Sequence, residues 1–559
     1  MKKFIIIIFL ANQLILYSQK ISLNKDFIYN NLRYQQLIGE ISPEFSFTLR
    51  PINLNNLNTT NFNYLYKNIK LRNTKKLKIK LLPVEYIIEF NSNYPYNRNN
   101  GSMIPNKGYQ HIVSLGLNIN YGPINIKLNP EHHFSENKKF PGFWEEHFPY
   151  VWVKRYKLWN KIDMPERFGN QNHNRLLIGQ SSISLNWKGI SIGFSNENIW
   201  WGPSIRNSIM MSNHSEGFRH LTFNTTKPIK TKIGNFEWQV IAGRLESSGY
   251  LPPNSDLIYS GSKLYTPRIN QLGERNDWRY LQGYTLTYSP NFIKGLSVGF
   301  IRWVQMYSAL LKGEYTWMEG VPSYFPAFSN LFRSSDKYDD IEFQMNQAAG
   351  LFLRWLWIDS KAEIYAEFHH NDSKLNIRDL MLDSDHSRAV TIGLQKVFKI
   401  NTKNILFNWE WTQMEQTAGR LVRDAGSWYE HGFVYDGYTN RGEVLGSSIG
   451  PGSNSHYFSL MKYRKKDNLG IAFEVIDQDN DFYYEAFSSS KDFRRYWKDF
   501  NFHLKYDIKF NNFHISSRAV FIRSLNYQWE LNEIDQPYYQ PGTDKNNFHL
   551  SLKVLYFVK

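Results

Sequence analysis

Apolar and polar residues alternate along most of this chain, from Lys78 to the C-terminus. Across residues 361–369, Ala362, Ile364, Ala366 and Phe368 alternate with Glu363, Tyr365, Glu367 and His369. Successive side chains of a β-strand point to opposite faces, so such a segment predicts a strand with one apolar and one polar face. The pattern recurs in about 18 segments of roughly 8 to 15 residues, which is typical of barrel strands.

The connections between these segments alternate between short and long. Short ones such as YGP at 121–123, WKG at 187–189 and SPNF at 289–292 supply the backbone angles that tight hairpins need. Between them lie loops of roughly 15 to 44 residues, and this asymmetry is typical of an outer-membrane barrel with short periplasmic turns and long extracellular loops. The long loops are 91–107, 137–180, 199–218, 251–277, 310–346, 372–387, 418–454, 481–496 and 529–545.

The N-terminal residues predict that the protein is exported. Lys2 and Lys3 precede the apolar stretch 4–17, which indicates a signal peptide over 1–18. The alternative, an N-terminal anchor helix, needs about 20 apolar residues. Residues 19–77 predict a small periplasmic or plug-like segment, in which Phe27, Ile28, Leu32, Leu37 and Ile38 form one amphipathic stretch near helical spacing. Residues 78–559 predict the barrel. The predicted fold class is thus all-β, a transmembrane antiparallel barrel in the outer membrane of a Gram-negative bacterium.

Composition agrees with this architecture. Mean hydropathy is −0.51 although 16% of residues are aromatic, as expected when only alternate residues face lipid and aromatic girdles line the interfaces. The chain has no cysteine, which excludes a lipoprotein anchor, disulfides and thiolate metal sites. The net charge of +16 favours contact with acidic polysaccharide or lipopolysaccharide phosphates; biased coding composition is the alternative.

Several phrases stand out in the loops: NSNYPYNRNNGSMIPNKGYQ at 91–110, WWGPSIRNSIMM at 200–211 and GYTNRGEVLGSSIGPG at 437–452. Together with the blocks around them, from about residue 81 to 484, they resemble the capsule-assembly Wzi family of outer-membrane proteins. The resemblance implies an 18-stranded, largely occluded barrel that binds surface polysaccharide and helps to retain or organise it. The family's periplasmic helical portion is poorly matched by residues 20–77.

Sugars present apolar C–H faces to aromatic rings and hydroxyls to planar polar groups, and arginine also pairs with anionic substituents. Two loops predict such contacts through Trp428, Tyr429, Tyr435, Tyr438 and Arg441, and through Trp200, Trp201 and Arg206. A third loop, 137–180, interleaves Trp144, Tyr150, Trp152, Tyr156 and Trp159 with Lys154, Arg155 and Lys157. The alternative for each group is bracing of a folded loop or membership of the aromatic girdle.

Signals of catalysis are weak. GSSIG at 446–450 matches GxSxG with Ser448 in the nucleophile position, but no helix pattern follows it as that motif requires. Glu363, Glu367 and His369 share one strand face and predict a polar lumen lining. The adjacent histidines at 132–133 and 369–370 point to opposite faces, so neither pair forms a metal site by itself. We predict no catalytic residues, no metal, no cofactor and no enzymatic activity.

The leading hypothesis is therefore a lectin-like outer-membrane protein whose partners are extracellular polysaccharide and the surrounding lipid and lipopolysaccharide, with other envelope assembly proteins as further candidates. A signal peptide and a barrel disfavour nucleic acid. The alternative is a porin or specific transporter, which would keep an open lumen. Outward loops rich in Trp and Tyr favour an occluded barrel.

Overall fold

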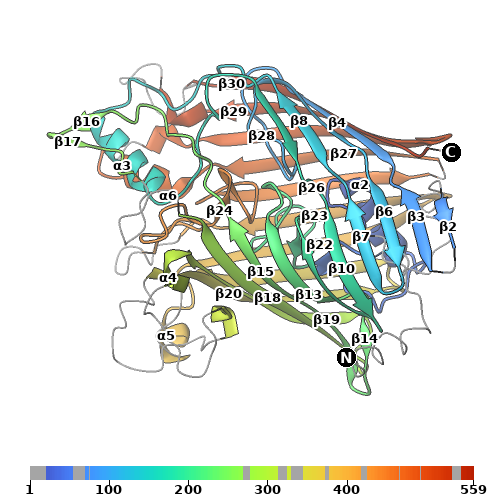
Figure 1. Ribbon diagram of the computed structural model, residues 1–559. Coiled ribbons are helices and arrows are strands. Elements are labelled where there is room, and N and C mark those ends of the chain that lie inside the picture. The colour runs from blue at the N-terminus through green and yellow to red at the C-terminus, as the bar shows by residue number, and fades with distance from the viewer. Residues whose placement is uncertain are drawn as a thin grey trace.

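A computed structural model describes residues 20–53, 70–74, 76–267, 277–312, 324–328, 344–371, 377–416, 425–464, 466–490, 493–531 and 543–558. The predicted signal peptide lies outside these ranges. Figure 1 shows the strands wrapped around the N-terminal helix α2, with the C-terminus at one end of the barrel and helices α3 and α6 at the other.

The main sheet contains 24 strands among the described residues, and all of its pairings are antiparallel. In chain order they are β2 (Lys70–Asn73), β3 (Leu77–Leu81), β4 (Val84–Asn91), β5 (Gly108–Ser114), β6 (Leu117–Tyr121), β7 (Ile124–Leu128), β8 (Glu131–Ser135), β9 (His173–Leu177), β10 (Ser182–Trp187), β11 (Ile190–Ser195), β13 (Arg219–Thr225), β14 (Ile229–Lys230), β15 (Gly234–Leu245), β18 (Arg279–Pro290), β19 (Leu296–Tyr307), β20 (Asn346–Trp357), β21 (Ala362–Asn371), β22 (Arg388–Ile400), β23 (Lys403–Gln413), β26 (Asn454–Tyr463), β27 (Asp467–Asp477), β28 (Lys498–Phe510), β29 (Phe513–Leu525) and β30 (Lys545–Tyr556).

The last strand lies beside one of the first. β30 pairs with β4 from His549 opposite Asn91 to Tyr556 opposite Val84, which is the contact that a closed barrel requires. The assigned strands outnumber the predicted ones because interruptions divide several long strands in two. Pro83 separates β3 from β4 and Pro130 separates β7 from β8; proline cannot donate a ladder hydrogen bond.

The predicted two-faced pattern of residues 361–369 is confirmed. Along β21, Glu363, Glu367 and His369 are fully buried in the lumen, whereas Phe368 is 39% exposed on the outer face. The lumen-facing carboxylates are used for internal contacts: His369 Nε2 lies 3.1 Å from Glu367 Oε2, and Glu363 accepts hydrogen bonds from Arg33 and Arg354. The apolar residues of the outer face are left free to meet lipid.

The N-terminal segment fills part of the lumen. Its helix α2 (Asp26–Leu37) buries Phe27, Ile28, Leu32 and Leu37, which belong to the amphipathic stretch seen in the sequence. Arg33 of this helix donates to Glu363 Oε1 over 2.6 Å. Further along, β1 (Leu49–Arg50) pairs with β12 (Trp200–Trp201), which lies in the WWGP block. These contacts place α2 and β1 inside the barrel, and we call these two elements the plug; the boundaries 1–18, 19–77 and 78–559 remain predictions.

The long-loop end carries the remaining elements. They are α3 (Pro149–Trp159), α4 (Ala309–Lys312), α5 (Ile377–Leu382), α6 (Asn480–Phe487), the hairpins β16 (Ile258–Tyr259) with β17 (Ser262–Lys263) and β24 (Thr439–Asn440) with β25 (Glu443–Val444), and the 3₁₀ turns η3 (Pro326–Phe328), η6 (Phe493–Arg495) and η7 (Tyr527–Trp529). α6 begins after Asp479, whose side chain caps the helix by accepting from the backbone of Phe482. Within the described ranges, helices are all too short or too polar to cross a membrane.

Candidate functional site

A cavity of about 240 Å³ lies among the outward loops; we call it the mouth cavity. Six of the predicted long loops, or the strand ends beside them, contribute to its wall. Its lining includes the polar, charged and aromatic side chains of Asn97, Arg98, Arg155, Trp159, Glu166, Glu443, Ser448, Asp479, Trp497, Tyr527, Gln528 and Trp529. The cavity therefore gathers aromatic rings, guanidinium groups and carboxyl groups from segments that are far apart in the sequence.

Arg155 is the most distinctive group of the mouth cavity. It projects from α3 so that its guanidinium carbon lies 4.7 Å from the ring centroid of Trp159, 5.0 Å from that of Phe482 and 5.2 Å from that of Trp529. One Nη donates to Asp479 over 3.2 Å, and the buried Nε has no hydrogen-bond partner among the described residues. Aromatic rings attract a cation over their faces. The surrounding rings therefore hold Arg155 in place, and its Nε–H remains available to donate to a ligand.

The rings of the cavity offer surfaces for sugar C–H faces. Trp497 lies edge-on to both Tyr527 and Trp529, with ring centroids 5.1 Å away in each case. The indole Nε1 of Trp529 has no hydrogen-bond partner in the described structure. Tryptophan and tyrosine combine a large apolar face with a polar edge, which is the combination that a pyranose ring needs.

Several polar atoms around the cavity also lack partners. Within the described residues, no hydrogen bond satisfies Asn97 Oδ1, Arg98 Nε, Ser448 Oγ or Gln528 Oε1, although all four atoms are buried. Buried polar atoms are nearly always paired in native proteins, with protein, water or ligand. The unpaired set contains both donors and acceptors, and hydroxyl groups of a sugar can serve as either.

Burial raises the pKa of two carboxyl groups of the cavity. Burial raises the pKa of Glu166, whose carboxylate accepts from the backbone N–H of Phe143 over 3.0 Å. Burial also raises the pKa of Glu443 well above its usual range, despite a hydrogen bond from Asn97. A protonated carboxyl group can donate as well as accept a hydrogen bond, which again suits a hydroxyl-rich ligand.

Glu443 gives a pH-dependent prediction. Since its native pKa is raised, the native state holds the proton more tightly than the unfolded chain, where the pKa is about 4.3. Its contribution to stability is full below that pH and is lost as pH rises through the native pKa. As the pH rises through the native pKa of Glu443, the unfolding temperature of the wild type should fall. We expect this fall to be smaller in Glu443→Gln, because glutamine cannot ionise. The exposed Glu145→Gln should leave the pH profile of the wild type unchanged, and an identical profile for both variants would contradict the assignment.

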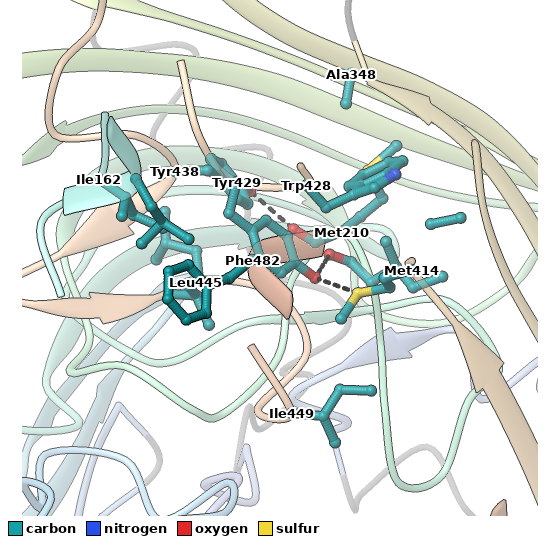
Figure 2. Close-up of a cluster of buried hydrophobic side chains, with 14 of the residues drawn as sticks. Ile162, Met210, Ala348, Met414, Trp428, Tyr429, Tyr438, Leu445, Ile449 and Phe482 are labelled. Atoms are coloured by element: carbon teal, nitrogen blue, oxygen red, sulfur yellow. Dashed lines mark hydrogen bonds between the residues drawn. The ribbon is translucent and has the colours of Figure 1, made fainter. Parts of the chain in front are cut away.

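Three of the residues predicted in loop 418–454 are buried and do not lie on a surface that a ligand could contact. Trp428, Tyr429 and Tyr438 are 0–1% exposed and pack in the core beneath the loops (Figure 2). Tyr438 stacks on Trp303 with ring centroids 3.8 Å apart and donates to the carbonyl of Met210 over 2.8 Å. Tyr429 donates to the carbonyl of Ile209 over 2.9 Å. These rings brace the loop, as the alternative interpretation of the sequence had it.

The remaining predicted residues are divided among other surroundings. Trp200 and Trp201 are buried in β12, and Trp201 Nε1 donates to Gln239 over 2.8 Å. Arg206 is buried and forms an ion pair with Glu474 over 2.8 Å. Tyr435 and Arg441 are partly exposed, with 38% of the Arg441 side chain accessible. None of these eight side chains lines the mouth cavity.

The sequence analysis singled out some of the residues that line the mouth cavity and missed others. Arg155 and Trp159 were singled out in loop 137–180, and Ser448 in GSSIG, where it lines the cavity without the helix that a nucleophile elbow needs. Trp497, Tyr527 and Trp529 were missed. Their signal was the repetition of aromatic residues where β28 begins and β29 ends. Within the described residues, no group of carboxylates and histidines is arranged to hold a metal ion.

Comparison with known proteins identifies relatives of the whole barrel. A family model for the capsule assembly protein Wzi matches residues 93–511. The structure resembles Wzi of Escherichia coli, described as an outer membrane protein involved in group 1 capsule assembly and as a carbohydrate-binding β-barrel, with a TM-score of 0.59 and 10% identity over 97% of this chain and 100% of that one. OccAB1 of Acinetobacter baumannii (TM-score 0.40, 8% identity, 85% and 96% of the chains) and OprD of Pseudomonas aeruginosa (0.37, 8%, 85% and 92%) are less similar. No curated protein sequence matches the chain.

Proposed function

Because this chain belongs to the capsule assembly Wzi family of outer-membrane barrels, we propose that it binds extracellular polysaccharide and helps to hold it at the cell surface. The observation that carries the proposal is Arg155, enclosed by aromatic rings on the wall of a cavity rich in unpaired polar atoms. A sugar unit can stack on Trp497, which is partly exposed, while its hydroxyl or carboxylate accepts from Arg155. The action is binding, without a chemical step.

The residues predicted from the sequence enter this proposal in two roles. We propose that Tyr435 and Arg441, which are partly exposed, make additional contacts with the polymer outside the mouth cavity. Trp428, Tyr429, Tyr438, Trp200, Trp201 and Arg206 support binding indirectly, because they hold the loops that shape the cavity. The porin alternative is disfavoured because α2, β1 and β12 occupy the lumen. Lipopolysaccharide and envelope proteins stay as predicted partners.

Arg155→Met is the sharpest test, since it keeps the length of the side chain but removes its charge and donors. Losing a hydrogen bond from a charged group costs about 1.5–3 kcal/mol, so we expect binding of purified polysaccharide to weaken by roughly 10–100-fold. Polymer held by many weak contacts should then pass from the cell surface into the medium. Surface polysaccharide and purified-barrel binding are both measured at matched protein levels.

Lys157→Met on the same helix is the matched control, because that side chain is 46% exposed and pairs with Glu485 away from the cavity. It should bind and retain polysaccharide like the wild type. Unchanged binding by a correctly folded Arg155→Met protein would exclude the mouth cavity as the site.

A further inference from the structure

A second cavity, of about 100 Å³, lies inside the lumen between the plug helix α2 and the barrel wall; we call it the lumen chamber. Its wall is strongly basic. It is lined by Arg50 of the plug, by Arg98 and Arg206 of the inward-folded loops, and by Lys505, Arg518 and Lys553 of β28, β29 and β30. Arg50, Arg206 and Lys553 are buried, the other three are partly exposed, and uncompensated buried charge is costly.

Carboxylates neutralise only part of this charge. Asp26, at the start of α2, binds Arg518 over 3.0 Å and Lys553 over 2.7 Å. Arg206 is matched by Glu474. The only other carboxylate of the chamber wall, Glu89, accepts from two amides, those of Asn100 and Gln110, over 2.9 and 3.3 Å.

Three cations remain without a carboxylate. Within the part of the chain that the structure describes, Arg50, Arg98 and Lys505 form no ion pair. Arg50 donates to the carbonyls of Phe47 and Ser204 over 3.3 and 2.9 Å, and Lys505 donates to the hydroxyl of Tyr457. Arg98 Nε is buried and has no hydrogen-bond partner there.

One further acid, Asp507, lies outside the chamber wall. Asp507 interacts with both Lys505 and Arg518, yet it forms no ion pair with either within the described residues. The indole Nε1 of Trp200, another side chain of the chamber wall, is likewise buried without an acceptor. The chamber therefore offers several donors and an excess of positive charge to a single bound group.

We propose that the lumen chamber binds a small inorganic oxyanion of the phosphate or sulfate class. Its volume is sufficient, since one water needs only about 10–15 Å³ measured in the same way and the chamber has about 100 Å³. Guanidinium and ammonium groups are the usual protein donors to tetrahedral oxyanions. Arg98 lines both cavities, so the anion site lies directly behind the mouth cavity. It shares Arg98 with the mouth cavity, and binding of the anion needs no sugar.

The test uses the full chain purified in detergent and titrated with inorganic phosphate at constant ionic strength, with chloride as the background anion. We expect saturable binding by the wild type and a rise in its unfolding temperature that equal chloride does not give. Lys505→Met should weaken phosphate binding by about tenfold or more, whereas Lys505→Arg, which keeps the charge, should retain it. Lys399→Met, an exposed lysine at the end of β22, is the matched control.

Two outcomes would overturn the proposal. One is the absence of saturable phosphate binding by the wild type, a result that requires no variant to fold. The other is unchanged affinity in a folded Lys505→Met barrel, which would place any bound anion elsewhere. Arg155→Met should leave phosphate binding intact, so failure of the oxyanion site and failure of polysaccharide binding are distinguishable.

Discussion

Replacing Glu363 by Leu is expected to loosen the plug and to destabilise the barrel by about 3–5 kcal/mol, the cost of leaving the partners of a buried ion pair uncompensated. Glu363 is fully buried between two arginines: Arg33 of α2 donates to Oε1 over 2.6 Å and Arg354 of β20 donates to Oε2 over 2.9 Å. The carboxylate is thus the link between the plug helix and the wall. Removing it leaves two like charges facing each other in a space closed to water.

Conductance across a planar bilayer and unfolding temperature in detergent both report this change. The wild type should stay closed, and Glu363→Leu should show openings together with a lower unfolding temperature. Glu44→Leu is the control, because Glu44 pairs with the exposed Lys230 and surface ion pairs contribute little. If the Glu363→Leu barrel shows no channel openings and unfolds at the wild-type temperature, the plug is held by its apolar contacts alone.

Much of the fold could be predicted because each strand of a barrel wall shows a local alternation of apolar and polar residues. Each strand has an apolar and a polar face, so the orientation of Glu363, Glu367 and Phe368 followed from parity alone. The plug was only partly predictable. Phe27 and Leu32 indicated an amphipathic helix, but the partners of Arg33 and Asp26 lie hundreds of residues away in the sequence.

The candidate site was predicted at the level of loops and not of side chains. Aromatic and basic residues in outward loops indicated sugar contacts, yet the sequence could not show which rings face a cavity and which face the core. Trp428 and Trp159 lie in equally aromatic loops, and the structure buries both in the same cluster, yet only Trp159 also borders the mouth cavity. That difference depends on how several long loops fold together, for which local sequence carries no signal.

Tyr438 supports the largest effect expected in the outward loops. Its ring is fully buried and stacks on Trp303, and its hydroxyl donates to Met210. We expect Tyr438→Ala to cost about 3–5 kcal/mol, as for other large buried aromatic side chains cut to alanine. Tyr438→Phe removes only the hydrogen bond and should cost about 0.5–1.5 kcal/mol.

Unfolding temperature and the rate of proteolysis in loop 418–454 measure these effects, and Phe433→Ala in the same loop, where the ring is 41% exposed, should change neither. The comparison separates bracing from binding. If Tyr438 braces the loop, Tyr438→Ala loses stability and polysaccharide together, whereas Arg155→Met loses polysaccharide with a smaller loss of stability. A Tyr438→Ala barrel that stays stable while it releases polysaccharide would instead make Tyr438 a direct ligand contact, which its burial argues against.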